Sequence, residues 1–291
     1  MIITSCGNSE KVARELAKKL KTTYSPLTIS AFPDGDTYLK FNTDLKGKKV
    51  VIVQSFQPSP EKSLLHVVFA GQTAQDLGAK KVILVAPYLA YTRQDARFHP
   101  GEAISSKIMG KLISVAFDRV ITFDPHLHRY KSMKEVFSCD ATKLSANTLI
   151  GKYIQKNIQN PVLVGPDGES SQWAAKIANT IGAESTVFEK KRYSSWKVRV
   201  EMVNPLPLKG RNVVIVDDII STGKTMIEAV KLAQRHKAQS ITAIGVHGIF
   251  VGDCYQKLKK MGVKIISTNC VKHVSNKIDV TPMLANELNG D

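Results

Sequence analysis

The 291-residue sequence has only four cysteines. Their spacing argues against a disulfide framework and against a zinc site. Cys6, Cys139, Cys254 and Cys270 lie far apart, with no CxxC pair and no paired Cys/His spacing. Disulfide frameworks and zinc sites show such spacings, so we expect reduced and mostly buried thiols.

Long apolar runs are also lacking. No segment approaches the ~20 apolar residues that a membrane-spanning helix requires, and we expect no membrane partner. Residues 1–20 pass from a short apolar strand directly into an amphipathic helical pattern. Because a basic segment followed by an apolar core is missing there, we expect no signal peptide and predict a cytoplasmic protein.

Acidic residues are outnumbered, with 41 Lys and Arg against 25 Asp and Glu, which gives a formal net charge of +16. This excess indicates an anionic partner. Aromatic residues make up only 7% of the chain, which is few for a surface that stacks nucleic-acid bases. The basic residues are spread along the chain and are not gathered into a stripe. Small phosphorylated substrates fit such a dispersed basic surface equally well, so charge alone does not decide between the two. The motifs below favour small phosphorylated substrates, and we expect no nucleic acid as a partner.

Short β-branched runs alternate with helical patterns, which predicts an α/β fold with mainly parallel sheets. The expected strands are 49–54, 81–86, 119–123, 162–165, 212–216 and 241–246, and the expected helices are 63–77, 104–115, 170–181 and 225–236. The pattern occurs twice, so we expect two tandem domains of similar architecture, 1–140 and 141–291. We expect 279–288 to form a short helix, and the last 15 or so residues to pack back on the first domain.

The strongest motif is a strand of Val and Ile that ends in two carboxylates, Asp217 and Asp218. A loop of small and hydroxyl-bearing residues follows and opens a helix, an arrangement whose backbone N–H groups can cradle a phosphate. The loop residues are Ser221, Thr222, Gly223, Lys224 and Thr225. The two carboxylates would repel a phosphate, so we expect them to face neutral hydroxyls such as a ribose 2′,3′-diol.

The end of this motif, Gly223-Lys224-Thr225, also matches the last residues of a P-loop. A P-loop would need a glycine at position 218, and that position is Asp218. The acidic pair followed by TGKT instead resembles the phosphoribosyl-diphosphate loop of the phosphoribosyltransferase superfamily.

Within that superfamily, two further segments resemble the ribose-phosphate pyrophosphokinases. The sequence FPDGD at 32–36 is similar to the family's FxDGE element, which implies that Phe32, Asp34 and Asp36 contact the adenine of ATP across a subunit interface. Asp36 stands where the family usually has the longer Glu. Without the resemblance, FPDGD would be a good turn.

The second segment, YTRQDARFHPGE at 91–102, resembles the family's RQD…GE stretch and follows an expected strand. The resemblance implies ATP-binding roles for Arg93, Gln94, Asp95 and Arg97. An arginine can bind phosphate or stack on an adenine face. A solvated charged loop is the alternative interpretation.

Two acidic turns complete the pattern. The sequence DPH at 124–126 resembles the family's D-x-H site, which implies that His126 is a catalytic residue and contacts metal-bound ATP. The sequence PDG at 166–168 resembles the family's PDxG turn, which places Asp167 near Mg²⁺ and the ribose. Mg²⁺ takes few protein ligands, mostly carboxylates.

A basic run at 189–192 precedes YSSW, and we predict a mobile loop there, ahead of a strand. It resembles the family's flexible catalytic loop, which implies catalytic roles for Lys190 and Arg192. A basic run without such context is usually a solvated face.

Together these resemblances, which cover nearly the whole chain, imply a ribose-phosphate diphosphokinase. The enzyme would use Mg²⁺, ATP and ribose 5-phosphate, as a homo-oligomer (a dimer or higher) whose active site lies at a subunit interface. Two other hypotheses stay open. A phosphoribosyltransferase would leave the ATP-like segments without purpose. A non-catalytic regulatory homologue would be favoured by loss of His126, Lys190 or Arg192, and all three are present.

Overall fold

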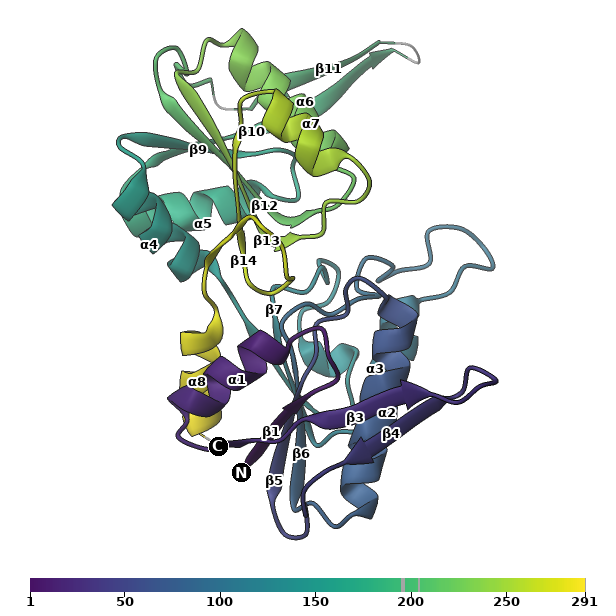
Figure 1. Ribbon diagram of the computed structural model, residues 1–291. Helices are drawn as coiled ribbons and strands as arrows, with labels where there is room; N and C mark the ends of the chain where they lie inside the picture. Colours follow the sequence, from purple (N-terminus) through teal and green to yellow (C-terminus); the bar gives the residue numbers. More distant parts are fainter. Residues whose placement is uncertain (195–196, 204, 291) are drawn as a thin grey trace. The chain divides into compact units, whose positions relative to one another are not determined.

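The computed structural model describes residues 1–194, 197–203 and 205–290, and only the backbone from 190 to 194 and from 197 to 201. The chain forms two compact units (Figure 1). The first comprises 1–144, 270–272 and 280–291, and the second comprises 145–269 and 273–279. Each unit has one main parallel sheet flanked by helices, so the predicted α/β class is confirmed.

The first unit is built on a six-stranded sheet in which all pairs are parallel. In spatial order its strands are β2 (Thr23–Tyr24), β1 (Ile2–Ser5), β5 (Lys49–Val53), β6 (Lys81–Ala86), β7 (Arg119–Phe123) and β8 (Asp140–Leu144). The central strands consist almost entirely of buried Val, Ile and Leu, because helices cover both faces of a parallel sheet.

Four helices flank this sheet: α1 (Glu10–Lys19), α2 (Pro60–Asp76), α3 (Ser105–Ser114) and α8 (Thr281–Asn289). Figure 1 shows α1 and α8 on one side of the sheet and α2 and α3 on the other. The last helix, α8, belongs to this unit and packs on α1. Its Glu287 forms a close ion pair with the buried Arg119 of β7, which also bonds to Thr142 at 2.8 Å. A separate antiparallel hairpin consists of β3 (Leu27–Ala31) and β4 (Thr37–Phe41).

The second unit has a seven-stranded sheet that is parallel except for one edge pair, β10 with β11. In spatial order its strands are β11 (Lys197–Met202), β10 (Glu184–Ser194), β9 (Pro161–Gly165), β12 (Asn212–Ile220), β13 (Ser240–Gly248), β14 (Lys264–Thr268) and β15 (Asn276–Ile278). Its helices are α4 (Asn147–Asn157), α5 (Ser171–Ile181), α6 (Lys224–Arg235) and α7 (Cys254–Lys260).

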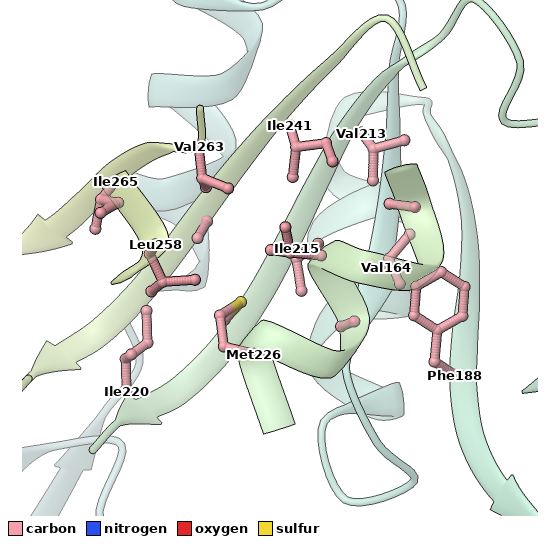
Figure 2. Close-up of a cluster of buried hydrophobic side chains, with 14 of the residues drawn as sticks. Val164, Phe188, Val213, Ile215, Ile220, Met226, Ile241, Leu258, Val263 and Ile265 are labelled. Carbon is pink, nitrogen blue, oxygen red and sulfur yellow. The ribbon is translucent and has the colours of Figure 1, made fainter. Parts of the chain in front are cut away.

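The core between this sheet and its helices holds the site strands in place. Figure 2 shows Val164 of β9 and Ile215 of β12 pointing into one apolar cluster with Met226 of α6 and Leu258 of α7. All four side chains are buried. The carboxyl end of β12 and the start of α6 are therefore fixed by the same core.

The two units share one winding order. In the first, the chain passes from β1 through α1 to β2 on one side, and from β5 through α2 to β6 on the other. In the second, β9, α5 and β10 correspond to the first path, and β12, α6 and β13 to the second. A crevice forms where such a winding reverses, at the carboxyl ends of the two central strands, and ligands bind there in open α/β sheets.

Among the described residues, no helix is both long and apolar enough to cross a membrane.

Candidate active site

In the second unit, this winding rule predicts the crevice at the carboxyl ends of the adjacent strands β9 and β12. Asp167 follows β9, and Asp217 and Asp218 belong to β12. The strand was predicted to end at residue 216, but its pairing with β13 continues through Asp217 to Ile220. The two carboxylates therefore sit on a rigid strand and not at the start of a loop. Asp218 is buried and Asp217 is half-buried.

These acidic groups interact strongly with one another. Burial, and after it the neighbouring carboxylates of Asp218 and Asp167, raises the pKa of Asp217 well above its ordinary value. Without a bound cation, Asp217 thus keeps its proton to a higher pH than a solvated carboxyl group does. A bound cation would relieve the repulsion and displace that proton.

The turn around Asp167 is held by one residue, Ser170. The Ser170 backbone N–H and hydroxyl donate to Asp167 Oδ1 at 3.0 and 2.8 Å, and the Asp167 N–H donates to the Ser170 hydroxyl at 3.1 Å. Within the described part of the chain no hydrogen bond reaches Oδ2, so this oxygen is available to a ligand. The Asp-x-x-Ser spacing is a local capping signal that could have been found in the sequence.

The loop between β12 and α6 presents backbone N–H groups at a helix start. Gly223 is the N-terminal cap of α6 in the left-handed conformation, at φ +72°. The first helical bond runs from the Ile227 N–H to the Gly223 carbonyl at 2.8 Å. The N–H groups of Lys224, Thr225 and Met226 precede this bond and have no helix carbonyl to bind, which makes the helix start a phosphate-binding position.

A neighbouring segment fixes the position of this loop. The N–H groups of Ile249 and Phe250 donate to the Ile220 carbonyl, and the Val251 N–H donates to the Ser221 carbonyl, all at 3.0 Å. The buried Cys254, at the start of α7, packs directly against Gly223. A β-carbon at Gly223 would collide with the Cys254 sulfur. The sequence did not predict the contact between Gly223 and Cys254, since 31 residues separate them.

In the first unit, residues 91–102 follow β6 as an irregular segment with many internal bonds. The Glu102 carboxylate accepts the N–H groups of Phe98 at 2.8 Å and His99 at 3.0 Å, and Arg97 Nε donates to the Glu102 carbonyl at 2.8 Å. The side chains assigned to ATP differ in exposure. Arg93 and Arg97 are exposed, Gln94 is half-buried and Asp95 is buried.

His126 follows β7 and lies beside His128. The His126 Nδ1 and His128 Nε2 atoms are 3.0 Å apart, and the rings meet edge to face with centroids 4.1 Å apart. This bond restricts the orientation of the His126 ring.

The FPDGD segment is the tip of the β3–β4 hairpin. The Phe32 N–H donates to the Asp36 carbonyl at 2.8 Å, and the Asp36 N–H donates to the Asp34 carboxylate at 3.2 Å. Phe32 is 51% exposed and packs edge-on against Tyr38. Among the described residues, no hydrogen bond joins this tip to the segment that contains Arg93.

Lys190 and Arg192 belong to β10, where they pair with Val200 and Val198 of β11. Their side chains lie outside the described part of the chain. The predicted loop is therefore wrong as far as Ser194, because the alternating sequence KVRVEM of β11 continues the sheet.

Two family models match this chain. Residues 1–116 match the family model for the N-terminal domain of ribose phosphate pyrophosphokinase, and residues 132–281 match the phosphoribosyl transferase domain. The ribose-phosphate pyrophosphokinase of Saccharolobus solfataricus is 34% identical over 98% of this chain and 99% of its own length. That of Sulfurisphaera tokodaii is 32% identical over 99% of this chain and its own full length.

Among solved structures, the phosphoribosylpyrophosphate synthetase of Mycobacterium smegmatis has the same fold. It matches with a TM-score of 0.87 and 24% identity, over 100% of this chain and 97% of its own.

Proposed function

Because this chain belongs to the ribose-phosphate pyrophosphokinase family, we propose that it transfers the β,γ-diphosphate of ATP to the C1 hydroxyl of ribose 5-phosphate. The products are 5-phosphoribosyl 1-diphosphate and AMP, for nucleotide biosynthesis. We further propose that the protein is cytoplasmic. One observation carries the proposal: the second-unit crevice combines a carboxylate pair with a helix start whose N–H groups lack helix partners. A sugar phosphate has the matching groups, a diol and a phosphate.

In this proposal the loop from Ser221 to Thr225 binds the 5-phosphate. Gly223 allows the backbone to approach the phosphate closely, while Lys224 supplies positive charge and the hydroxyl groups of Ser221, Thr222 and Thr225 add donors. Asp217 and Asp218 accept hydrogen bonds from the ribose hydroxyls. The sugar is then fixed at both ends, with its C1 hydroxyl directed toward the incoming phosphorus.

The first unit binds ATP in this proposal. Arg93 and Arg97 engage the phosphates or the adenine face, and Gln94 supplies hydrogen bonds. The hairpin residues Phe32, Asp34 and Asp36 contact the adenine of ATP on a neighbouring subunit. His126 and Asp167 contact the Mg²⁺–ATP complex, in which the ion neutralises phosphate charge. Lys190 and Arg192 act on the charge that develops on the transferred group.

An assay of AMP separates this proposal from its rivals. The protein is incubated with MgATP, with and without ribose 5-phosphate, and AMP is measured. We expect AMP only when both substrates are present. A phosphoribosyltransferase would instead consume phosphoribosyl diphosphate without ATP, and a regulatory homologue would form no product from either mixture.

The loop glycine gives a direct test of the phosphate site. We expect Gly223→Ala to raise the KM for ribose 5-phosphate about tenfold or more, since strain at positive φ contributes roughly 1–3 kcal/mol and the new methyl displaces the loop from Cys254. Steady-state kinetics measure the change. Gly210→Ala is the matched control, because Gly210 has nearly the same φ, +71°, and open space around its α-carbon. Equal effects at both positions would contradict the assignment.

An exposed apolar surface on the first unit supports the proposed homo-oligomer, a dimer or higher. Helix α3 and the residue after it expose Ile108, Leu112 and Val115, which are spaced to form one stripe. Helix α2 exposes Leu65 and Phe69, and the Gln72 side chain of the same stripe bonds to the Val115 carbonyl. The two stripes are therefore neighbours, and joined apolar patches of this kind mark protein interfaces.

We expect Leu112→Glu to dissociate the oligomer and to lower the activity of each subunit, since a carboxylate would be buried at the interface. Light scattering and activity are measured over the same dilution series. Lys111→Gln is the matched control, because it makes the same change in net charge at an adjacent exposed position. A fully active monomer would contradict the proposed subunit interface.

A further inference from the structure

We infer that Arg129 is a positioning residue that holds the ATP-binding segment in place by binding the buried carboxylate of Asp95. This inference rests on the proposed function, which assigns ATP to Arg93, Gln94 and Arg97. It changes the expected role of Asp95, whose carboxylate is directed to Arg129 and not to the nucleotide.

Arg129 binds both oxygens of a carboxylate that is shielded from water. The Asp95 residue is only 3% exposed. Arg129 Nη1 lies 2.6 Å from Asp95 Oδ1, and the Arg129 backbone N–H donates to Oδ2 at 3.2 Å. A buried carboxylate is stable only with such partners, and removal of one partner leaves the other uncompensated. The two residues are therefore strongly coupled.

The same guanidinium makes a second contact to the segment. Its Cζ atom lies 4.8 Å from the centroid of the Phe98 ring, a cation–π arrangement. Arg129 thus holds the segment at residues 95 and 98. Glu102 closes the next turn by accepting the N–H groups of Phe98 and His99. These contacts restrain the segment at several points between residues 95 and 102.

The proposed ATP-binding side chains lie next to these contact points. Arg93 and Gln94 immediately precede Asp95, and Arg97 immediately precedes Phe98. If the backbone beneath them is already fixed, only their side chains have to order on binding, and this lowers the entropic cost of binding. Arg129 also follows His126 by three residues, so it joins the His126 turn to the ATP segment.

The role predicts a specific kinetic effect. We expect Arg129→Met, which keeps an apolar side chain of similar length, to raise the KM for ATP about tenfold or more, the loss of one charge-assisted contact. The KM for ribose 5-phosphate should change less than about threefold, since its site lies in the other unit. Arg129→Lys keeps the charge but loses the planar fork, and we expect an intermediate KM.

Arg14→Met is the matched control. Arg14 also pairs with a carboxylate, Glu10 at 2.7 Å, and lies 4.3 Å from an aromatic centroid, that of Tyr24. It lies on the exposed side of α1, outside the proposed site. We expect this variant to keep the kinetic constants of the unmodified enzyme.

A double-mutant cycle with Asp95→Asn separates positioning from direct contact with ATP. If Arg129 acts through Asp95, the double variant should be no worse than the poorer single variant. If the fold increases in the KM for ATP multiplied in the double variant, Arg129 would act on ATP independently of Asp95, and the inference would be overturned. An unchanged KM for ATP in Arg129→Met would do the same.

A milder variant covers the case in which Arg129→Met does not fold. Phe98 is 50% exposed, so Phe98→Leu should fold normally. Loss of the cation–π contact should raise the KM for ATP about two- to fivefold, and an unchanged KM would count against the inference. If the unmodified protein forms no AMP from ATP and ribose 5-phosphate, it is the proposed function that fails.

Discussion

Replacement of Lys190 or Arg192 with alanine is expected to lower kcat by about 10³-fold or more, by analogy with arginine fingers that act on a transferred phosphoryl group. The KM values for both substrates should change little, because an interaction formed mainly in the transition state contributes little to ground-state binding. Steady-state kinetics with each substrate varied in turn provide the measurement.

The residue between them is the matched control. The backbone of β10 is extended at Lys191, which pairs with Arg199. Neighbouring residues in a strand face opposite sides, so Lys191 is not expected to share the role of Lys190 and Arg192. Lys191→Ala should therefore keep most of the activity. Equal losses of kcat at all three positions would show that the segment only attracts anions in general. An unchanged kcat in Lys190→Ala or Arg192→Ala would show that the residue takes no part in catalysis.

The second large effect is expected at the carboxylate pair. Asp218→Ala should raise the KM for ribose 5-phosphate by about 10²-fold, since a hydrogen bond to a charged group contributes roughly 1.5–3 kcal/mol and Asp218 shares the ribose hydroxyls with Asp217 in our proposal. ATP binding, measured by calorimetry, should change far less.

Asp253→Ala is the control for this experiment. Asp253 lies in the same unit, just before α7, and its carboxylate pairs with Lys257 at 2.9 Å on the exposed surface. The Asp253→Ala substitution removes one negative charge from the same unit and leaves β12 unchanged. If Asp218→Ala lowered only the affinity for ATP, or if both variants behaved alike, the ribose assignment would be wrong.

Much of the fold could be predicted because its signals are local. The strands β5, β6 and β12 are runs of Val and Ile, and such runs read as strands buried on both faces wherever they occur. The helices predicted from regular apolar spacing begin and end within a few residues of the expected boundaries. The loop from Ser221 to Thr225 was visible for the same reason, since strand, loop and helix start are contiguous in the chain.

Other parts of the site depend on contacts between distant residues, which leave no local pattern. Asp95 and Arg129 are 34 residues apart, and each appears as an ordinary charged residue in its own segment. The packing of Cys254 under Gly223 is hidden in the same way. The β10 strand was mistaken for a loop because Lys and Arg have low strand propensity, and only its pairing with β11 stabilises it there.

The most direct test of the proposed reaction is to identify which phosphorus is attacked. The protein is incubated with MgATP and ribose 5-phosphate, and the mixture is followed by ³¹P nuclear magnetic resonance, with Lys190→Ala as a control for contaminating activity. We predict signals of AMP and of a diphosphate bonded to the ribose C1 oxygen, with little signal from the control. Formation of ADP and a ribose bisphosphate would show attack on the γ-phosphorus and would contradict the account.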